Sequence, residues 1–409
     1  MSVDNMLPEI RIKGFRGEWE KKKIGEILAE IKRPIELMDS ESYQLVTVKR
    51  RNEGVVPRAV LKGQNILVKN YFTVRAGDYL ISKRQVVHGA NGIVPDNLDG
   101  AVVSNEYLVV TDSDDITARY WTVISNRPEM HKLFFVSSYG VDIEKLVFDV
   151  TDWKNRTIVI PQITEQKNIT DYFQKLDALI NKHQQKHDKL SSIKKAMLEK
   201  MFPKQGETTP EIRFKGFSGE WEEIKFKEMA EIKRGLTYKP TDLVDEGVVV
   251  LRSSNINIDK FELRKDDVQV DKKAVNINYI NNGDILITSA NGSTQLVGKH
   301  AVVKNLNIDS VHGGFMLAAT TNAPDFLNAS MNTYWYNRFL SMNVSGGNGA
   351  IGNIKGSILE EELLYVPKKD ERDKIGYYFQ KLDELINQHQ QQIIKLNNIK
   401  QACLSKMFV

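Results

Sequence analysis

The sequence contains a single cysteine, Cys403, among its 409 residues. One cysteine excludes a disulfide framework and any zinc site built from several cysteines of this chain. The opening residues MSVDNMLPEIRIKGF lack the apolar core of a secretory signal peptide, and no run of about 18 consecutive apolar residues occurs. We therefore expect a protein of the reducing cytoplasm that does not span a membrane.

Sequence patterns of common catalytic sites are also missing. The chain has no GxxxxGK[ST] phosphate loop, no HExxH zinc motif and no Asn-Pro-Pro-aromatic tetrapeptide of amino-methyltransferases. A literal GxGxxG occurs at 347–352, but deep in the second half and not between a first apolar strand and a helix, which favours a Gly/Asn loop. We predict no catalytic residue, no metal ligand and no cofactor of its own for this chain.

Composition bounds the architecture more than the function. Hydrophobic residues make up 41% and charged residues 27%, as in an ordinary folded protein. The net charge of +4 is compatible with nucleic-acid binding but is equally common in proteins that bind none. A chain of this length exceeds the usual limit for a single core, so at least two domains are expected.

The most informative feature is an internal repeat. The segment PEIRIKGFRGEWE at 8–20 recurs as PEIRFKGFSGEWE at 210–222, and FQKLDALINKHQQ at 173–185 recurs as FQKLDELINQHQQ at 379–391. The stretches between these segments align only in scattered places, such as 77–82 with 283–288. The unit is therefore a constant entry segment, a variable domain and a constant helix, duplicated once.

The constant segments near 173 and 379 predict two long helices. Residues 164–202 contain no proline or glycine, and Pro161 and Pro203 bracket them. Apolar residues recur with heptad spacing, which predicts that a helix about 57 Å long pairs with its second copy. Polar seam residues, including Lys194 and Lys400, would set the register; pairing with another chain is the alternative. The predicted seam consists of Phe173, Leu176, Ile180, His183 and Leu190, with Phe379, Leu382, Ile386, His389 and Leu396.

The variable stretches, about 21–160 and 223–366, predict mainly short strands, because segments rich in Val, Ile, Thr and aromatics are cut by Gly, Asn and Asp turns. We therefore predict an α+β fold: two globular α+β domains separated by two long coiled-coil helices, related by an internal pseudo-two-fold duplication. The expected divisions are 1–160 for the first domain, 161–206 for the central helix and linker, 207–366 for the second domain, and 367–409 for the last helix.

Polar and basic clusters follow several predicted strands, where recognition residues tend to lie. Arginine can bind guanine, Asn or Gln can bind adenine, and Lys and Arg neutralise phosphates. Each cluster alone is typical of a solvated turn, but clusters follow the Gly-Asp strands of both halves, which favours DNA contact. The candidates are Lys49, Arg50, Arg51, Ser82, Lys83, Arg84, Gln85, Asn105 and Tyr139 in the first half, and Arg252, Ser253, Asn255, Ser289, Asn291, Ser293, Thr294, Gln295, His312 and Asn348 in the second.

The two entry segments, the PQITEQ lead at 161–166 and the paired FQKLD helices resemble the specificity subunit of type I restriction-modification systems. The resemblance covers the whole chain, although PKKDER at 367–372 lacks the final Gln of the first lead. It implies antiparallel helices and two target-recognition domains, each contacting one half of a split asymmetric site in the major groove. The helices would set the length of the spacer between the half-sites.

The resemblance also implies partners. These are double-stranded DNA, two modification subunits that use S-adenosylmethionine, and restriction subunits that use ATP and Mg. Adenine methylation and cleavage would then be carried out by those subunits, and this chain would be a non-catalytic specificity subunit. The alternative is a duplicated coiled-coil scaffold that binds protein, whose affinity would be indifferent to DNA sequence and would depend little on salt.

Overall fold

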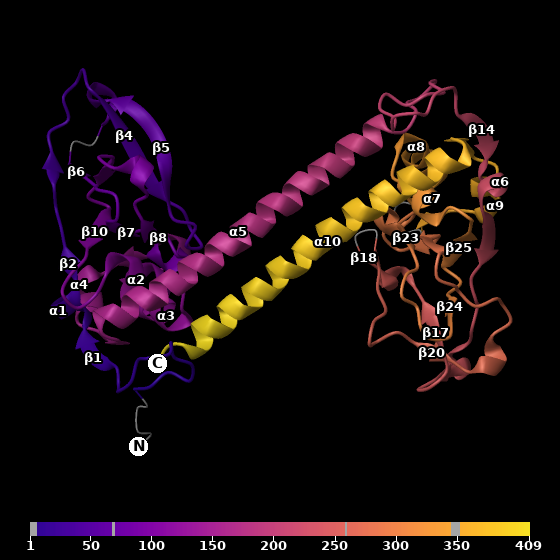
Figure 1. The fold of residues 1–409 in the computed structure, drawn as a ribbon. Coiled ribbons are helices and arrows are strands. Elements are labelled where there is room, and N and C mark those ends of the chain that lie inside the picture. Colours follow the sequence, from indigo (N-terminus) through magenta and orange to yellow (C-terminus); the bar gives the residue numbers. More distant parts are fainter. Residues whose placement is uncertain (1–5, 68–69, 258–259, 345–351) are drawn as a thin grey trace. The chain divides into compact units, whose positions relative to one another are not determined.

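The computed structural model describes residues 6–67, 70–257, 260–344 and 352–409. These fall into two compact units (Figure 1): Met1–His183 with Gln391–Val409, here the first unit, and Gln184–Gln390, the second unit. Each unit contains one variable domain and half of each long helix. The domain limits expected from the sequence describe the order of segments along the chain and stay a prediction.

The first unit is built on two mainly antiparallel sheets. One has the order β2 (Ala29–Glu30), β10 (Tyr107–Thr111), β7 (Tyr79–Ser82) and β8 (Asn91–Ile93); the other has the order β3 (Pro34–Ile35), β6 (Tyr71–Thr73), β9 (Val102–Ser104), β4 (Ser42–Val48) and β5 (Val55–Lys62). Strand β7 is buried on both faces: Tyr79 and Ile81 belong to the largest core cluster of this unit, whereas Leu80 belongs to another. This alternation explains why the strand is a continuous apolar run.

Helices cover one face of the first sheet. They are α2 (Ala118–Ile124), α3 (Pro128–Val136) and α4 (Val150–Lys154), with the short α1 (Ile24–Ile27) beside the pair β1 (Glu20–Lys23) and β13 (Thr157–Ile160). Trp121, Phe134 and Trp153 are fully buried in this layer, and the centroid of the Trp153 ring lies 5.5 Å from that of each of the other two. A further strand pair, β11 (Ser138–Tyr139) and β12 (Val147–Phe148), follows α3.

The second unit repeats this plan. Its first sheet has the order β15 (Glu231–Arg234), β25 (Met316–Thr320), β21 (Ile285–Thr288) and β23 (His300–Val302), and its second has β16 (Leu243–Val244), β20 (Gln269–Val270), β17 (Val248–Leu251) and β24 (Ser310–His312). Small strand pairs are β14 (Glu222–Lys225) with β27 (Leu363–Val366), β18 (Ile256–Asn257) with β19 (Lys260–Phe261), and β22 (Ala290–Asn291) with β26 (Gly352–Asn353). The helices are α6 (Phe226–Met229), α7 (Pro324–Ser330), α8 (Tyr334–Asn343) and α9 (Gly356–Glu360).

The two predicted long helices are α5 (Ile163–Lys200) and α10 (Lys369–Lys406). They pack together in opposite directions within each unit (Figure 1): Lys400 on α10 pairs with Asp177 on α5 at 2.6 Å in the first unit, and Lys194 on α5 pairs with Asp383 on α10 at 2.6 Å in the second. These ion pairs are equivalent in the repeat. The predicted α+β fold class, with two duplicated regions and two packed long helices, is therefore confirmed.

The ten predicted seam residues all lie buried or half-buried along these helices. Phe173 and Phe379 are 3% and 1% exposed, and each helps to form the main core of its own unit. The aromatic ends of the seams thus anchor each long helix to a variable domain, whereas the middle positions, including His183 and His389, are half-buried.

The pair between Lys194 and Asp383 provides a test of the register. We expect Lys194→Glu to lower the free energy of unfolding by about 1 kcal/mol, because it places two carboxylates together where an ion pair of modest strength existed. Adding Asp383→Lys should recover most of this loss. The comparison is made by urea unfolding of the whole chain, with the exposed Lys195→Glu as control. If Lys194→Glu and the control lower the free energy of unfolding equally, the ion pair does not help to set the register of the two helices.

Candidate nucleic-acid interface

The repeated entry segments attach each variable domain to both long helices. In the first unit Arg11 donates from Nε and Nη2 to the two carboxylate oxygens of Glu165, each at 2.7 Å. In the second unit Arg213 makes the same two bonds to Glu371, at 2.8 and 2.6 Å. Both carboxylates are 2% exposed, and these hydrogen bonds raise the pKa of each arginine above its usual value.

The same segments also hold the ends of the opposite helices. The backbone N–H of Ile10 donates to the carbonyl of Lys406, at the end of α10, and that of Ile212 donates to the carbonyl of Lys200, at the end of α5. Each entry segment therefore joins the start of one long helix to the end of the other. This double attachment explains why the entry sequence is preserved in both copies while the domains between have diverged.

Three of the sequence-predicted clusters in the first unit are brought together by hydrogen bonds. Lys83 Nζ donates to the carbonyl of Asn105 at 2.7 Å, and the carbonyl of Lys83 accepts from the N–H of Phe148 at 2.9 Å. Strand β12, which contains Phe148, pairs with β11 and so carries Tyr139 to the same place. The loop after β7, the turn before β10 and the loop after α3 thus form one surface.

The turn between β4 and β5 joins this surface. Arg51 and Asn52 both adopt positive φ angles, 60° and 56°, a conformation that residues other than glycine rarely adopt. The N–H groups of these residues donate to the carbonyls of His88 and Gly89, which follow the Lys83 loop. The turn is therefore fixed against the neighbouring loop, and it presents the exposed side chains of the preceding residues, Lys49 and Arg50, to solvent.

Polar groups converge in the second unit at the equivalent strand ends. Thr288 Oγ1 donates to Ser253 Oγ at 3.2 Å, and the N–H of Ile354 donates to the carbonyl of Ser289 at 2.8 Å. The loop that follows β21 exposes Ser293, Thr294 and Gln295, with Asn291 half-buried at its start. Arg252 and Ser253, also half-buried, follow β17. Asn348 lies outside the described residues.

Four of the sequence-predicted contact residues lie inside the fold. Ser82, Asn255, Ser289 and His312 are 7%, 0%, 6% and 1% exposed. Asn255 donates to the carbonyl of Glu262 and to Asp267 Oδ2, and His312 Nε2 bonds the carbonyl of Lys233. Burial lowers the pKa of His312, which keeps the ring neutral at physiological pH. Burial places these four side chains in the interior, and those of Asn255 and His312 bind neighbouring segments there.

One exposed side chain on this surface, Phe315, was not among the sequence-based candidates. Phe315 lies in the turn between β24 and β25 and is 66% exposed. Glu106, which belongs to the polar cluster of Asn105 in the sequence, lies in the turn before β10 and accepts a hydrogen bond from Arg84 Nε at 2.8 Å. The signal that could have identified Phe315 is the Gly313-Gly314 pair that precedes it, since two glycines interrupt the apolar strand pattern.

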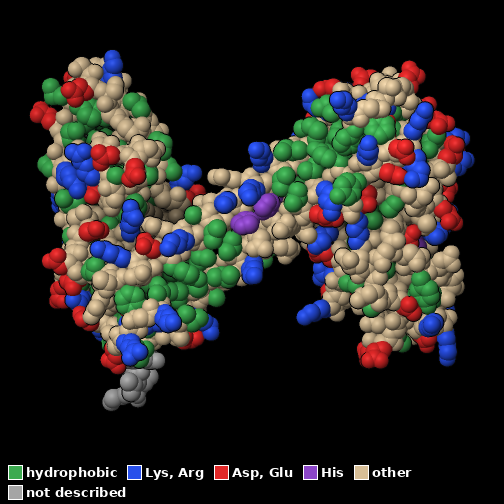
Figure 2. Space-filling model, in the orientation of Figure 1, with side chains coloured by type: hydrophobic (Ala, Val, Ile, Leu, Met, Phe, Trp, Pro, Cys, Tyr) green, Lys and Arg blue, Asp and Glu red, His purple; other side chains and the backbone are tan. Residues whose placement is uncertain are grey.

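Surface charge alone would not locate an interface. Lys and Arg side chains are mixed with Asp and Glu over both units in Figure 2. Several cations of the first unit are paired: Arg50 with Glu144 at 2.7 Å and Arg84 with Glu106 at 2.8 Å. The candidate interface is therefore distinguished by which polar side chains come together rather than by a uniformly basic face.

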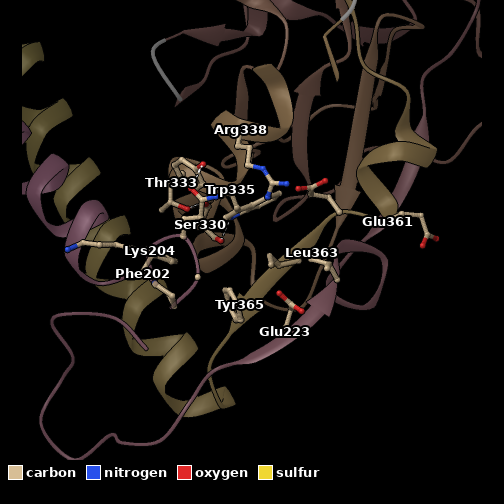
Figure 3. Close-up of a pocket in the computed structure, with 16 residues that line it drawn as sticks. Phe202, Lys204, Glu223, Ser330, Thr333, Trp335, Arg338, Glu361, Leu363 and Tyr365 are labelled. Carbon is tan, nitrogen blue, oxygen red and sulfur yellow. Dashed lines mark hydrogen bonds between the residues drawn. The ribbon is translucent and has the colours of Figure 1, made fainter. Parts of the chain in front are cut away.

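A pocket of about 320 Å³ lies in the second unit, between the end of α5, α8 and β27 (Figure 3). Several polar side chains of its lining make internal hydrogen bonds: Trp335 Nε1 donates to Ser330 Oγ, and Tyr334 donates to Gln205. Glu361 accepts from two lysines, which lowers the pKa of its carboxyl to about 2. Such a lining is typical of a packing defect at a joint between elements.

Within the described residues, no group of three or more His, Cys, Asp and Glu side chains is arranged to hold a metal ion. Among the same residues, no helix combines the length and the apolar character that crossing a membrane requires.

Comparison with known proteins gives a consistent match. The family model described as "Type I restriction modification DNA specificity domain" matches residues 16–192 and again 218–398. The chain is 22% identical over 253 residues to the type I restriction enzyme MjaVIII specificity subunit of Methanocaldococcus jannaschii and 22% identical over 265 residues to the EcoKI specificity subunit of Escherichia coli. These alignments cover 59% and 61% of this chain, and it spans 56% of each relative's length.

Among solved structures, the fold is similar to that of a type I restriction-modification system S subunit from M. genitalium. The TM-score is 0.60 at 13% sequence identity, and the alignment covers 99% of both chains. At this identity the likeness concerns the fold alone.

Proposed function

The chain belongs to the type I restriction-modification DNA specificity family, and from this premise we propose that it is the subunit that gives such a complex its DNA sequence preference. The observation that carries the proposal is the match of the family model to both halves, 16–192 and 218–398. A chain with two such regions can contact two separate half-sites, one with each region. Because the exposed polar side chains of the two regions differ, the half-sites should differ as well, giving a split asymmetric site.

The exposed and half-buried candidates define the proposed DNA-contacting surface. In the first unit these are Lys49, Arg50, Arg51, Lys83, Arg84, Gln85, Asn105 and Tyr139, and in the second Arg252, Ser253, Asn291, Ser293, Thr294 and Gln295. Arg and Lys supply phosphate contacts and guanine contacts, and the amides and hydroxyls supply contacts to adenine and other base edges. The paired helices would fix the length of the unread spacer.

Catalysis is assigned to partner subunits. We expect two modification subunits, because the two entry segments and the two long helices offer each partner an equivalent surface. Leu179 on α5 and Leu385 on α10, which are equivalent in the repeat, are 44% and 43% exposed and give both helices a matching apolar contact point. S-adenosylmethionine would be bound by these subunits, and ATP and Mg by restriction subunits, all in the cytoplasm. This chain would act as a non-catalytic component.

The proposal is tested by mapping adenine methylation across a genome with long-read sequencing. A host that expresses this chain with its modification subunit is compared with a host that lacks only this chain. We expect one split motif with a fixed spacer to be methylated only in the first host. If methylation is unchanged while the same modification subunit is active with another specificity subunit, the chain is not a DNA specificity subunit.

A second readout separates DNA recognition from the scaffold alternative. We expect affinity of the assembled complex for its motif to fall steeply between 50 and 200 mM salt, on the order of a thousandfold if about six phosphates are contacted. Affinity that depends little on salt and is indifferent to sequence would favour a protein-binding scaffold.

A further inference from the structure

The turns that lead into β10 and β25, here called the tips, are equivalent positions in the two units. Tyr107, the first residue of β10, pairs with Ser82, and Met316, the first residue of β25, pairs with Thr288. Ser82 and Thr288 end the matched strands β7 and β21, so the residues just before β10 and β25 correspond.

Those residues are Glu106 and Phe315. Their backbones make the same contact: the carbonyl of Glu106 accepts from the N–H of Lys83 at 2.9 Å, and that of Phe315 accepts from the N–H of Ser289 at 2.9 Å. One structural position therefore carries a carboxylate in the first unit and a phenyl ring in the second.

The first tip holds an oriented charged pair. Arg84 Nε donates to Glu106 Oε2 at 2.8 Å, and the two side chains are 56% and 47% exposed. Because this bond uses Nε, the terminal nitrogens Nη1 and Nη2 can donate to a second acceptor, and the carboxylate retains acceptor capacity at Oε1. An exposed ion pair contributes little to stability, so stability alone does not account for the arrangement.

The second tip holds an apolar side chain instead. Phe315 is 66% exposed, and the residue equivalent to Arg84 is Ala290, whose N–H donates to the carbonyl of Phe315 at 3.1 Å. The N–H of Gly313 donates to the carbonyl of Leu251 at 2.9 Å and that of Met316 to the carbonyl of Gly313 at 2.8 Å, which fixes the turn. The phenyl ring is thus presented on a rigid backbone without being used in its own core.

The chemistry of these side chains matches different base pairs. Paired arginine donors fit O6 and N7 of guanine, and a carboxylate accepts from N4 of cytosine. A phenyl ring has no such bond to offer, and the only apolar group at the base edges of the major groove is the thymine C5-methyl group. The side chains at the two tips would therefore select a G·C pair in one half-site, through Arg84 and Glu106, and an A·T pair in the other, through Phe315.

We propose that the side chains gathered at this tip contact bases in both units: Arg84, held against the tip by Glu106, contacts guanine in one half-site, and Phe315, on the tip itself, contacts a thymine methyl group in the other. The inference rests on the proposed function and adds to it the position and the base at that position. It also makes Glu106 a positioning residue, since it acts by orienting the guanidinium.

The first experiment maps the methylated motif for the wild-type complex and for complexes containing Arg84→Ala or Phe315→Ala. We expect Arg84→Ala to lower the discrimination at a single G·C position of one half-site by roughly tenfold. Phe315→Ala should relax a single A·T position of the other half-site. In each variant, retained selectivity at the other half-site shows that the complex is folded and assembled.

Matched controls come from the same units. Arg75, in the first unit, is 59% exposed and pairs with Asp99 at 3.2 Å, so Arg75→Ala removes a similar ion pair at the opposite end of β7. Leu243 is 44% exposed in the second unit, so Leu243→Ala removes an exposed apolar side chain away from the tip. Both controls should leave the motif unchanged.

The second experiment removes the methyl group from the DNA. Replacing the contacted thymine by uracil should slow wild-type methylation of an oligonucleotide by about fourfold, the effect of one buried methyl group, and should not slow the Phe315→Ala complex. Equal slowing of both complexes would overturn the contact with Phe315. A relaxed position that is not G·C for Arg84→Ala, or no relaxed position while the wild type has a split motif, would overturn the contact with Arg84. Absence of any motif in the wild type would instead reject the proposed function.

Discussion

Replacing Glu371 by glutamine is expected to lower the free energy of unfolding of the second unit by about 3 kcal/mol. Glu371 is 2% exposed and accepts two hydrogen bonds from the Arg213 guanidinium, whose side chain is 16% exposed and which also donates to the carbonyls of Ser218 and Gly219. Glutamine has nearly the same shape but no charge, so the largely buried arginine would keep its bonds to the carbonyls of Ser218 and Gly219 but would lose its only carboxylate partner in the described residues. The change would also loosen the junction of the entry segment with the start of α10.

The measurement is urea unfolding of the whole chain combined with hydrogen exchange, which assigns the loss to one unit. Glu165→Gln should produce the same loss in the first unit, because Arg11 and Glu165 are the equivalent pair. Glu384→Gln is the control, since its ion pair with Lys381 on α10 is half exposed and should contribute only a few tenths of a kcal/mol.

A double variant separates two effects of breaking the buried pair: the loss of its hydrogen bonds and the burial of a charge without its partner. Replacing Arg213 and Glu371 together by methionine removes both charges, so the loss should be much smaller than for Glu371→Gln alone. If the double replacement is as damaging as the single one, then the bonds themselves, and not the uncompensated charge, stabilise the junction.

The architecture could be predicted from the sequence because the segments that determine it occur twice. The two entry segments, and the heptad pattern between Pro161 and Pro203, act locally or over one helix, so their consequences can be derived without knowing the rest of the fold. The ion pair of Arg11 with Glu165 could not be derived in this way. It joins residues 154 positions apart, and both types of residue are common on ordinary surfaces.

The sequence did not reveal which of the candidate interface residues are exposed, because exposure depends on tertiary packing. Asn255 and Ser253 belong to one polar run, yet Asn255 is fully buried and caps the turn by accepting from the N–H of Arg252. Phe315 shows the opposite case. An apolar residue beside a strand is normally assigned to the core, whereas the Phe315 side chain is exposed to solvent. Neither outcome follows from residue type.

The equivalence of Glu106 and Phe315 could not be derived from the repeat in the sequence either, because the offset between the two copies changes. The offset between matched strands is 285 − 79 = 206 at the start of β7 and β21 but 316 − 107 = 209 at the start of β10 and β25. The intervening segments differ in length, so a constant-offset alignment compares unrelated residues. Only the strand pairing identifies the shared position.

Insertion of seven residues into α5 after Gln184 is expected to abolish methylation at the original motif, with a loss of at least tenfold. In the second unit the entry segment binds both the end of α5, through Ile212 and Lys200, and the start of α10, through Arg213 and Glu371. The insertion would lengthen α5 alone by about 10 Å. If the helices stayed paired, the entry segment could then not keep both attachments. The pair of Lys194 with Asp383 would be displaced as well.

A matching insertion after Gln390 in α10 tests whether the helices set the spacer. With seven residues added to each helix, the antiparallel ion pairs can form again, and the chain should recover its resistance to urea. If the proposed function is right, any methylation that returns should occur at the same half-sites with a spacer longer by about three base pairs, because about 10 Å of helix corresponds to three steps of 3.4 Å along DNA. Methylation of the original spacer by either insertion variant would mean that the paired helices do not determine the distance between the half-sites.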